Sequence, residues 1–557
     1  MSKAHDISPH QSLWWQSGVI YQIYPRSFKD SNGDGVGDLA GIIEKLDYLS
    51  WLGVDALWLS PIYPSPMVDF GYDISNFTDI DPLFGNLAAF DMLVKEAHQR
   101  NLKIIMDYVP NHTSDRHPWF IESRSSRDNP RRDWYVWADP KSDGSPPNNW
   151  LASWGSSAWE WDAVTGQYYL HSYHKAMPDL NWRNPAVKEA MFDVARFWLD
   201  RGVDGLRIDS AHRIMKDPQL RDNPPNPNPG ETGYKPVTEY DSQLHIHDKA
   251  HPDVHEVYRE LRQLLDAYSE TSPRVSVGEM HIFDWPEWAS YYGLQLDEMH
   301  MPLNFGLLSI PWKAAAVQKL VNAVESALPA GAWPNYVLSN HDEPRIAARV
   351  GAEQARIAML LLLTLRGTPT VYYGEEIGMH DGEIPPEYIQ DPWEIAQPGK
   401  GVGRDPERTP MQWDASPNAG FCAPTIKPWL PIPADYKQTN VAVEREDSHS
   451  MLALTRALLQ LRRATPALSV GSYAAIEGAP GDCFVYTRQS ENQRFLIALN
   501  FSSNEQRIRL AGLGNGRILL STHLDHEEAV ELTSLSLRGN EGCVIEILHP
   551  GTTSRTK

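Results

Sequence analysis

The feature that most constrains the fold is a series of short apolar segments, each followed by a loop and then by a helical pattern. Continuous apolar runs of this kind are typical of parallel strands that are buried on both faces. The helical stretches between them include residues 41–53 and 88–101. Eight such repeats favour a closed (β/α)8 barrel over an open doubly wound sheet. The predicted strands lie at residues 18–25, 54–60, 102–110, 203–209, 273–280, 298–305, 335–340 and 368–374.

A long interruption follows the third predicted strand. Residues 111–184 are too many for one crossover and are rich in Trp, Asn, Pro and Asp, so we interpret them as a domain inserted after strand 3. Within this insertion, residues 150–161 carry several tryptophans, which we expect to form its core. The alternative is an aromatic wall beside a binding site. A second interruption, residues 221–236, is proline-rich and predicts a surface loop.

The pattern changes again after residue 465. Residues 483–488, 494–501 and 543–550 alternate between apolar and polar side chains, as half-buried antiparallel strands do. We therefore predict a separate C-terminal β-sandwich domain. The predicted fold is thus an α/β chain, with the barrel in two parts at 1–110 and 185–465, the inserted domain at 111–184 and the C-terminal domain at 466–557.

Composition limits the possible partners. The chain has 72 acidic and 50 basic side chains and a net charge of −22, which disfavours nucleic acid and anionic membranes and favours a neutral or cationic ligand. The longest aliphatic run, MLLLL at 359–363, is too short to cross a bilayer, and the N-terminus lacks the apolar core of a signal peptide. Three scattered cysteines, Cys422, Cys483 and Cys543, indicate neither a disulfide framework nor a cysteine metal site. We expect a cytoplasmic protein.

Ionisable side chains gather at the carboxyl ends of four predicted strands. In a (β/α)8 barrel these ends meet at one face and build a common site. A single aspartate at a strand end is usually a helix cap, but capping does not explain ionisable groups at four strand ends, and buried carboxylates are unfavourable unless paired or used. We therefore predict a functional cleft formed by Asp107, Asn111, His112, Arg207, Asp209, Glu279, Asn340, His341 and Asp342.

This set of side chains favours glycoside hydrolysis over metal-dependent hydrolysis. Two histidines on separate strands, without the spacing of an HExxH motif, make a poor zinc site. Cleavage of a glycosidic bond needs one carboxylate as nucleophile or base and one carboxylic acid as proton donor. A third carboxylate can stabilise the transition state or bind sugar hydroxyls.

Several segments resemble the signature segments of one known family, glycoside hydrolase family 13. The four main matches are DYVPNH (107–112), GLRID (205–209), VGEM (277–280) and SNHD (339–342). Further matches, in the order of the family, are QIYPRSF (22–28), GYDISNF (71–77), MPDLNW (177–182), GTPTVYYGEEIGM (367–379) and RDPERTPMQW (404–413). The first and the last of these further matches resemble the alpha-glucosidase and oligo-1,6-glucosidase branch more than the starch-cleaving amylases.

The resemblance implies a retaining mechanism. Asp209 is expected to be the nucleophile that forms a covalent β-glucosyl–enzyme intermediate, and Glu279 the general acid and then base. Asp342 is expected to bind sugar hydroxyls and to stabilise the transition state. We expect neighbouring groups to raise the pKa of Glu279, while Arg207 keeps Asp209 ionised.

The same resemblance implies the residues that bind the substrate. His112 and His341 are expected to hydrogen-bond the glucose. Asp73, with Tyr72 beside it, and Arg408 are expected to be the two residues that grip the non-reducing end. Such a grip closes the pocket, and a closed pocket favours exo-cleavage of short substrates.

The expected activity is that of an exo-acting α-glucosidase that releases glucose from short α-glucosides and also transfers it to sugar or alcohol acceptors. No organic cofactor is expected, and the chain is expected to be a monomer or a homodimer. Ser210 follows the predicted nucleophile, and a small polar residue at this position favours α-1,4 linkages such as that of maltose. Met177 and Glu343 depart from the residues usual in the family, on the expected acceptor side. The alternatives are a dedicated α-glucosyltransferase, a sucrose isomerase and an oligo-1,6-glucosidase with the same site.

The loop DSNGDGVGD, residues 30–38, has oxygen-bearing side chains at alternate positions, as an EF-hand loop does. It departs from an EF-hand because Gly41 stands where the bidentate glutamate belongs, and because a strand is predicted before it in place of a helix. In the family that the chain resembles, this loop holds a structural Ca2+ or Mg2+. The implied ligands are Asp30, Asn32, Asp34, Asp38 and the carbonyl group of Val36.

Overall fold

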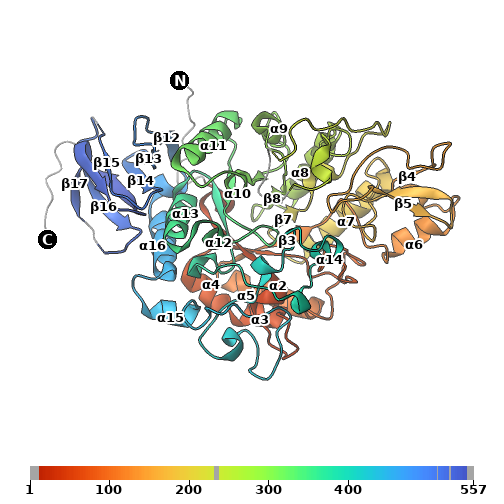
Figure 1. The fold of residues 1–557 in the computed structure, drawn as a ribbon, viewed down its shortest axis with the longest axis horizontal. Coiled ribbons are helices and arrows are strands. Elements are labelled where there is room, and N and C mark those ends of the chain that lie inside the picture. Colours follow the sequence, from red (N-terminus) through yellow and green to blue (C-terminus); the bar gives the residue numbers. More distant parts are fainter. Residues whose placement is uncertain (1–11, 231–236, 511, 526–527, 549–557) are drawn as a thin grey trace.

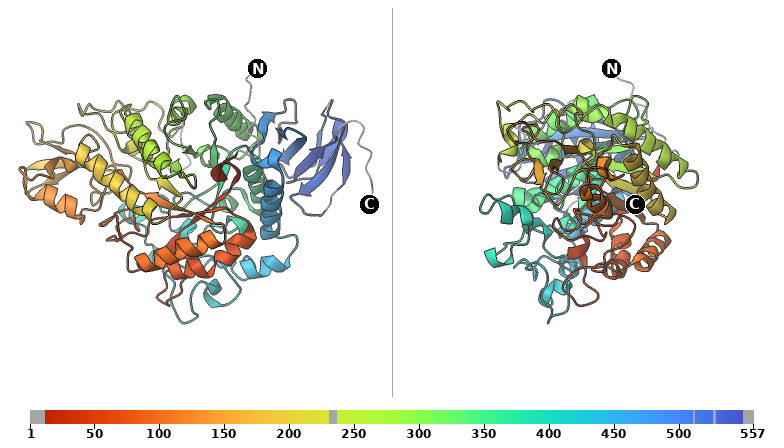
Figure 2. Two further views of the ribbon diagram at one scale, coloured as in Figure 1. Left: turned by 180° about the vertical axis from the view of Figure 1, so that it is seen from behind. Right: turned by 90° about the vertical axis from the view of Figure 1, so that its right-hand side faces the viewer.

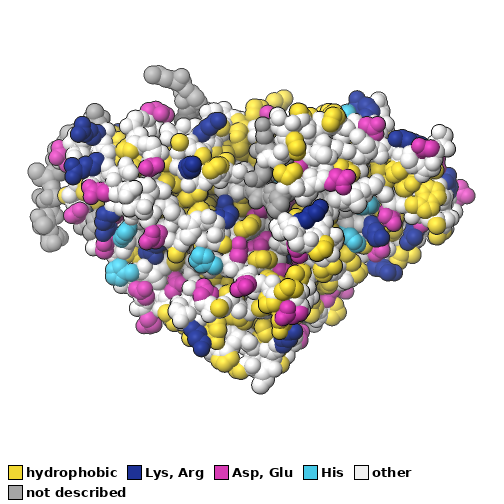
Figure 3. All heavy atoms as spheres, in the orientation of Figure 1, with side chains coloured by type: hydrophobic (Ala, Val, Ile, Leu, Met, Phe, Trp, Pro, Cys, Tyr) yellow, Lys and Arg dark blue, Asp and Glu magenta, His cyan; other side chains and the backbone are white. Residues whose placement is uncertain are grey.

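The computed structural model describes residues 12–230, 237–510, 512–525 and 528–548, and it shows a barrel with a small antiparallel sheet at one end and a larger one at the other (Figure 1). From behind, the two sheets again lie at opposite ends of the barrel (Figure 2). On the face drawn in Figure 3, Lys and Arg side chains lie scattered among Asp and Glu side chains. No helix within these ranges combines the length and the apolar character that crossing a lipid bilayer demands.

Eight parallel strands close the barrel, and each lies inside one of the eight predicted segments. Neighbouring strands pair in parallel, and β1 pairs with both β2 and β11, which closes the ring. The prediction of a closed barrel is therefore confirmed. The strands are β1 (Ile20–Ile23), β2 (Ala56–Leu59), β3 (Lys103–Tyr108), β7 (Gly205–Ile208), β8 (Val275–Gly278), β9 (Met301–Asn304), β10 (Asn335–Val337) and β11 (Thr368–Tyr372).

Successive residues of the barrel strands pack on opposite sides of the sheet. Ile20, Trp58 and Ile105, from three neighbouring strands, belong to one buried cluster in the barrel interior. Tyr21 and Leu57, which are their neighbours in sequence, belong to the larger cluster formed with the surrounding helices. Because both faces of each strand are buried, both kinds of position are apolar, and the strands read as continuous apolar runs.

The helices around the barrel begin and end at residues that favour helix boundaries. The predicted helix at 41–53 is two helices, α3 (Leu39–Glu44) and α4 (Leu46–Leu52), because Lys45 between them has a ψ of 1°. Asp38 caps α3 by accepting a hydrogen bond from Gly41 N, and α4 ends at Gly53 with a φ of 103°. The predicted helix at 88–101 is α5 (Leu87–Gln99). The other long helices are α7 (Pro185–Asp200), α8 (Val254–Ala267), α11 (Ala314–Ala327), α13 (Ala352–Thr364) and α16 (Met451–Ala464).

The predicted insertion after β3 is present, and it contains a three-stranded antiparallel sheet. Its order is β4 (Trp137–Ala138), β6 (Gln167–Leu170) and β5 (Trp159–Asp162). Trp150 and Trp159 pack in the core of the insertion, so the prediction of a tryptophan core is confirmed for these two. In the proline-rich segment, residues 221–230 form neither helix nor strand, and residues 231–236 lie outside the described ranges.

The C-terminal part is an antiparallel β domain, as predicted. A two-stranded sheet, β15 (Gln506–Ile508) with β18 (Leu535–Leu537), packs on the larger sheet through Val485, Ile508 and Leu537. The six strands of the larger sheet are, in spatial order, β12 (Ser472–Ala475), β13 (Cys483–Ser490), β14 (Gln493–Asn500), β19 (Gly542–Ile547), β16 (Asn515–Ser521) and β17 (Ala529–Glu531).

Helix α13 lies between the barrel and this C-terminal domain. Its segment MLLLL, residues 359–363, is at most 1% exposed, and the helix contacts both α16 and β14. The Thr364 hydroxyl hydrogen-bonds the Tyr486 hydroxyl at 2.6 Å, and Arg488 Nη1 donates to the Thr364 carbonyl at 2.5 Å. The apolar run that is too short for a membrane span is thus a helix buried on all sides.

Candidate active site

Three neighbouring strands bring one arginine and three carboxylates together. Arg207 on β7 pairs in register with Asp107 on β3, and Glu279 directly follows β8 on the other side. Arg207 Nη1 donates to Asp107 Oδ1 at 2.9 Å and to Asp209 Oδ1 at 2.7 Å, and its Nη2 forms an ion pair with Glu279 Oε2 at 3.0 Å. All four side chains are at most 8% exposed. Their charges therefore interact with little screening by water.

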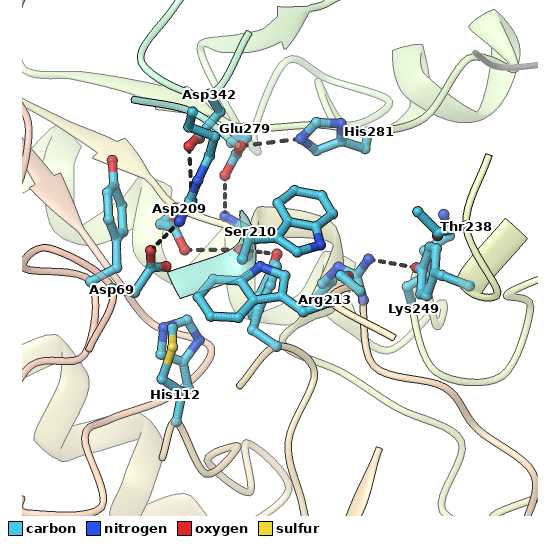
Figure 4. A pocket seen from close by; sticks show the side chains of 18 of the residues that line it. Asp69, His112, Asp209, Ser210, Arg213, Thr238, Lys249, Glu279, His281 and Asp342 are labelled. Atoms are coloured by element: carbon cyan, nitrogen blue, oxygen red, sulfur yellow. Dashed lines mark hydrogen bonds and ion pairs between the residues drawn. The ribbon is translucent and has the colours of Figure 1, made fainter. Parts of the chain in front are cut away.

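Ser210 connects two of these carboxylates (Figure 4). Its N–H donates to Glu279 Oε2 at 2.9 Å, and its hydroxyl donates to Asp209 Oδ2 at 2.9 Å. Its backbone has a φ of 48° and a ψ of 37°, a left-handed conformation that is unfavourable for most residues. The Tyr173 hydroxyl lies 2.5 Å from the Ser210 hydroxyl. The strained turn thus directs the N–H of Ser210 at Glu279 and its hydroxyl at Asp209.

A chain of hydrogen bonds forms the floor of the site. Gln22 Nε2 lies 2.8 Å from His341 Nδ1, His341 Nε2 lies 2.7 Å from the Tyr72 hydroxyl, and this hydroxyl donates to Asp107 Oδ2 at 3.0 Å. Burial lowers the pKa of His341 to about 3, so the ring is neutral. With Gln22 donating to Nδ1, the proton is on Nε2 and points at Tyr72.

Asp342 lies at the end of the barrel beside two arginines. It follows β10 in the segment SNHD, and its side chain is 26% exposed. Its Oδ1 accepts hydrogen bonds from Arg408 Nη2 at 2.8 Å and from Arg404 Nη1 at 3.1 Å. Arg404 Nη2 also forms an ion pair with Asp69 Oδ1 at 2.7 Å. Two arginines thus hold two carboxylates, Asp69 and Asp342, at the wall of the pocket.

The carboxylates of Asp209 and Glu279 titrate as a pair. Burial raises the pKa of Asp209 well above its ordinary value, and the charge of Glu279 raises it further. For Glu279 the effect of burial is outweighed by the charge of Arg207 and by His281, so its pKa lies below the ordinary value. We expected neighbouring groups to raise the pKa of Glu279 and to keep Asp209 ionised. In the protein without a ligand this expectation is wrong, because the pKa of Asp209 is raised and that of Glu279 is lowered. Because both carboxylates contact Arg207 and interact with each other, their titration is a property of the pair.

Asp209, Glu279 and Asp342 line one pocket with a volume of about 260 Å³. In Figure 4, Asp69 and His112 lie on one side of Asp209, and Arg213 and Lys249 lie on the other. Burial lowers the pKa of His112 to about 4, so its ring is neutral. Its Nε2 is buried and has no hydrogen-bond partner among the described residues. A ligand hydroxyl could supply that partner.

Two tryptophans from distant segments form part of the pocket wall. Trp154 comes from the insertion and Trp393 from the short helix α14 (Pro392–Ala396). Their rings stack with 6.1 Å between centroids and 12° between planes, and the guanidinium of Arg404 lies over both. For Trp154, the alternative interpretation of the tryptophan-rich stretch, an aromatic wall, is therefore correct.

The comparison with known families agrees with this geometry. A family model described as the catalytic domain of alpha-amylase matches residues 22–471, which include the insertion and all of the barrel strands except the first two residues of β1. The chain belongs to the alpha-amylase family. The resemblance to glycoside hydrolase family 13 is thereby confirmed, and the protein is a glycoside hydrolase of its alpha-glucosidase group.

Curated relatives and solved structures match this alpha-amylase family member over nearly its full length. The chain is 39% identical to an oligo-1,6-glucosidase of Parageobacillus thermoglucosidasius, over 97% of this chain and 100% of that protein. It is 42% identical to a probable alpha-glucosidase of Rhizobium meliloti, over 92% and 95%. Among solved structures, the alpha-glucosyl transfer enzyme XgtA has a TM-score of 0.90 at 42% identity, with 96% of this chain and 100% of that chain covered. The trehalulose synthase MutB of Pseudomonas mesoacidophila has a TM-score of 0.86 at 34% identity, over 96% and 99%.

The structure brings most of the predicted site residues together. Asp209, Glu279, Asp342, Tyr72 and His112 line the pocket. Arg207, His341 and Arg408 lie directly behind them, through the hydrogen bonds given above. Met177 and Glu343, the two departures from the family pattern, also line the pocket.

Asp73 is an exception to this arrangement. Its side chain is fully buried and accepts hydrogen bonds from the Ser65 hydroxyl at 2.8 Å, from Val68 N at 2.9 Å and from Asp69 N at 2.9 Å. It does not line the pocket and forms no ion pair with Arg408. The prediction that Asp73 grips the sugar is therefore wrong, because its carboxylate holds the backbone of its own loop and does not reach the pocket.

Asp69 and Arg404 stand where the gripping residues were expected. The turn at Gly71, which has a φ of 112°, separates Asp69 from Tyr72. The hydrogen bond from Asp69 N to Asp73 fixes this turn, so Asp73 acts on the pocket through Asp69. Asp69 lies just before the matched segment GYDISNF, and Arg404 is the first residue of RDPERTPMQW. The position of each residue beside or within a matched segment is therefore a signal that could have identified it.

Other residues of the pocket have no comparable sequence signal. Trp393, Tyr173, Arg213, Lys249 and His281 lie outside the quoted motifs and line the pocket. They come from separate segments of the chain, and only the folded structure places them together. His281 Nε2 lies 3.2 Å from Glu279 Oε1 and so contacts the catalytic pair directly.

The loop 30–38 lies apart from the pocket, and its side chains fold back on its own backbone. Asp30 accepts hydrogen bonds from Asn32 N, Gly33 N and Gly35 N, at 3.0, 2.6 and 2.9 Å. Asp38 accepts from the Ser31 hydroxyl at 2.8 Å. Carboxylate, amide and carbonyl oxygens are the donors that Ca2+ prefers. Within the described ranges, however, no three His, Cys, Asp or Glu side chains converge as metal ligands. The cation at this loop stays a prediction.

Proposed function

We propose that the protein is a retaining, exo-acting α-glucosidase that releases glucose from the non-reducing end of short α-glucosides. The observation that carries this proposal is the contact of one guanidinium, Arg207, with both Asp209 and Glu279 at the base of the pocket. Two carboxylates that bind the same guanidinium lie close together, and a retaining pair needs a separation of about 5 Å. An inverting pair, which leaves room for a water molecule, stands further apart.

The first half of the reaction forms a covalent intermediate. An oxygen of Asp209 attacks the anomeric carbon, while Glu279 donates a proton to the glycosidic oxygen, so that the aglycone leaves as a neutral alcohol. In the second half, Glu279 takes a proton from water or from another hydroxyl, whose oxygen bonds to the anomeric carbon and displaces Asp209. The positive charge that develops on the sugar ring lies beside the carboxylates of Asp209 and Asp342.

The coupled titration of the two carboxylates suits this sequence of events. A glycosidic oxygen next to Glu279 is a proton acceptor, and the anomeric carbon next to Asp209 becomes electron-poor. Both effects favour the state in which Glu279 holds the proton and Asp209 is ionised. The substrate thus selects the protonation state that the chemistry requires, although the isolated pair places the proton on Asp209.

The proposed glucose subsite has polar groups but little room beyond one ring. Asp69, Arg404 and Asp342 provide acceptors and donors for hydroxyl groups at one side, and the unpartnered Nε2 of His112 is available at the other. Because the Asp69–Arg404 ion pair lies across this end, the chain of a longer glucan could not continue through it. This arrangement supports exo-cleavage.

Glucosyl transfer to sugars or alcohols is a second activity that we propose for the same site. The stacked rings of Trp154 and Trp393 offer an apolar surface on which an acceptor can exclude water. The similarity to the alpha-glucosyl transfer enzyme XgtA supports this proposal. Ser210 has a small side chain beside Asp209, and we propose a preference for α-1,4 bonds on that basis.

Product analysis tests these proposals. We expect glucose from maltose at a higher kcat/KM than from isomaltose or sucrose, and α-glucose as the first anomer in the proton NMR spectrum. The Asp209→Asn variant should release no p-nitrophenol from p-nitrophenyl α-glucoside, yet melt at the temperature of the parent protein. Initial release of β-glucose, or persistent turnover by this variant, would contradict the mechanism. Transglucosylation products with added sugar or alcohol measure the second activity.

We further propose that the loop 30–38 binds Ca2+ or Mg2+ through Asp30, Asn32, Asp34, Asp38 and the Val36 carbonyl. The donor types support this proposal, since all are hard oxygen ligands. Such an ion would connect the loop after β1 to the start of α3, which Asp38 caps. Its role would be structural, because the loop lies apart from the pocket-lining residues.

A further inference from the structure

The pocket contains a buried arginine that has no carboxylate partner among the described residues. Arg213 is 5% exposed and lines the pocket. Its Nη2 donates to the Tyr240 hydroxyl at 2.5 Å, and its guanidinium carbon lies 5.2 Å and 5.4 Å from the ring centroids of Tyr173 and Tyr240. Among the described residues Arg213 forms no ion pair, and its Nε has no hydrogen-bond partner. A buried charge without a counterion is unfavourable unless a ligand supplies one.

The acidic side chains around Arg213 are engaged with other groups. Asp248 accepts hydrogen bonds from His245 Nδ1 at 2.7 Å and from Asn223 Nδ2 at 3.1 Å. Asp241 accepts from Thr238 N at 2.7 Å and so closes its own turn. The carboxylates of the catalytic centre have their own arginines, as described above. The positive charge of Arg213 is therefore not neutralised by a direct contact within the described part of the chain.

Lys249 is a second cation on the same side of the pocket. In Figure 4 it lies beside Thr238 and Arg213, on the side away from Asp69 and His112. Its ammonium group makes no hydrogen bond and no ion pair with any described residue. Burial, with the charge of Arg213 adding to it, lowers the pKa of Lys249 to about 8. The ammonium group is thus still mainly charged at neutral pH, and an anion beside it would stabilise this form.

We propose that the acceptor side of this pocket binds a hydroxy compound carrying an oxyanion, a carboxylate or a phosphate monoester, between Arg213 and Lys249. The inference deepens the proposed function and rests on it, since it names the class of aglycone and acceptor. A guanidinium fork matches both kinds of oxyanion, and an ammonium group adds a second point of attraction. Arg213 lies on the turn after β7, four residues after Asp209, and Tyr173 contacts both the Ser210 hydroxyl beside Asp209 and the guanidinium of Arg213, so one small ligand can reach both groups.

The transfer step needs no further reagent. Glu279 takes the proton of the acceptor hydroxyl, the hydroxyl oxygen bonds to the anomeric carbon, and the bond between that carbon and Asp209 breaks. Asp209 leaves as a carboxylate, and the charge of the oxyanion does not change. Hydrolysis of the resulting anionic glucoside is the reverse of this step followed by attack of water.

The test compares three acceptors with the same carbon skeleton: glycerol, glycerate and glycerol 3-phosphate. With p-nitrophenyl α-glucoside as donor, we expect at least one of the anions to have a kcat/KM for transfer about tenfold above that of glycerol. Separate arms with glycerate and with glycerol 3-phosphate distinguish a carboxylate from a phosphate ligand. Added NaCl should raise the KM for the anion and leave that for glycerol unchanged.

Two variants assign the effect to the two cations. In Arg213→Gln and in Lys249→Gln the ratio of anion to glycerol transfer should fall about tenfold, because each loses one charged contact. Transfer to glycerol is the internal reference, so a general loss of activity does not affect the ratio. Arg213→Lys, which keeps the charge, covers the case in which Arg213→Gln fails to fold. Arg116→Gln is the control, since Arg116 is 74% exposed and does not line this pocket.

The outcomes are distinct. An anion-to-glycerol ratio near one in the parent protein, or an unchanged ratio in both charge variants, overturns the inference and leaves the α-glucosidase proposal intact. If the parent protein releases no p-nitrophenol, the proposed function itself is wrong. In that case, calorimetric titration of the protein with glycerate and with glycerol 3-phosphate still decides whether the two cations bind an oxyanion, and absence of binding overturns the inference.

Discussion

Arg207 contacts both Asp209 and Glu279, with Nη1 2.7 Å from one carboxylate and Nη2 3.0 Å from the other. A guanidinium group can do this because its nitrogens are fixed in one plane, whereas an ammonium group is a single point charge. The contact therefore controls two properties of the pair at once, the distance between the carboxylates and the ease with which they ionise.

We expect Arg207→Lys to lower kcat about a thousandfold, because one ammonium group cannot hold both carboxylates in place. Arg207→Gln also removes the positive charge, which raises the pKa of the carboxylates. The acid limb of its kcat/KM profile should therefore move to higher pH, while that of Arg207→Lys moves less. A pH–rate profile on p-nitrophenyl α-glucoside measures both. If the acid limb did not shift in either variant, Arg207 would not be the group that lowers the pKa values of Asp209 and Glu279.

Asp69→Asn should lower kcat/KM for maltose about a hundredfold, since it removes the charged partner of Arg404 beside the proposed glucose subsite. Asp73→Asn is the matched control. It replaces one carboxylate oxygen with an amino group that cannot accept, so at least one of the three loop hydrogen bonds is lost, and it should lower the melting temperature more than Asp69→Asn does. Steady-state kinetics and thermal melting of both variants provide the check. A larger melting shift for Asp69→Asn would reverse the roles given to the two aspartates.

Trp154→Ala should lower the ratio of transfer to hydrolysis about tenfold, because it removes one of the two stacked rings beside which an acceptor binds. Trp154→Phe keeps an aromatic face and should retain most of the ratio. Product analysis with p-nitrophenyl α-glucoside and an added acceptor gives both values. An unchanged ratio in Trp154→Ala would mean that the acceptor does not contact this ring.

His117 makes the fold sensitive to acid. Its Nδ1 accepts a hydrogen bond from Trp119 N at the start of α6 (Pro118–Ser125), and burial, with a smaller effect of Arg131, lowers its pKa to about 3. The unfolded chain, with a histidine pKa of about 6.5, therefore binds the proton first. The contribution to stability is complete above pH 6.5 and is lost as the pH falls towards 3, by about 1.4 kcal/mol per pH unit.

His117→Asn should reduce this acid sensitivity, because asparagine can cap the helix without titrating. Urea unfolding of the parent and the variant between neutral and acidic pH measures the difference. We expect the two free energies of unfolding to converge as the pH falls. Parallel curves would show that His117 does not bind a proton on unfolding.

Ca2+ should raise the melting temperature of the protein, and a chelator should lower it, if the loop 30–38 binds a cation. Asp30→Asn should abolish the response to Ca2+. Asp47→Asn serves as the control, since Asp47 is an exposed side chain on α4. Calcium-independent melting of the parent protein would contradict the proposed site. Because the loop lies apart from the pocket, kcat at temperatures well below melting should not change.

The barrel could be predicted because strands buried on both faces leave an uninterrupted apolar signal. The break of one predicted helix at Lys45 could not, since no proline or glycine marks it. Asp209, Glu279 and Asp342 could be predicted from their place at strand ends, which the barrel brings together. Asp69 and Asp73 are both acidic and lie four residues apart, and only the turn at Gly71 decides which one faces the pocket.

The remaining parts of the site depend on contacts between distant segments, and the spacing of motifs along the sequence does not reveal these contacts. Trp154 and Trp393 are 239 positions apart in the numbering and meet only because the insertion folds over the barrel. The protonation of Asp209 and Glu279 depends on which carboxylates Arg207 reaches, and a motif gives only the identities of these residues. Arg213 and Lys249 lie outside the matched segments, so neither could be assigned before the pocket was known.

The burial of α13 has a consequence for the way the chain acquires its fold during synthesis. This helix precedes the last barrel strand, β11, yet its covering strands, β14 and β19, begin only at residues 493 and 542. A Cβ added at Gly542 would lie 3.2 Å from Ile357 and 3.3 Å from Leu360, which shows how closely the two pack. Until this late segment has left the ribosome, the face of α13 that these strands cover stays exposed. The cover of α13 is therefore added only after the barrel strands have been made, and a chain that ends before β19 would expose this apolar face to chaperones and proteases.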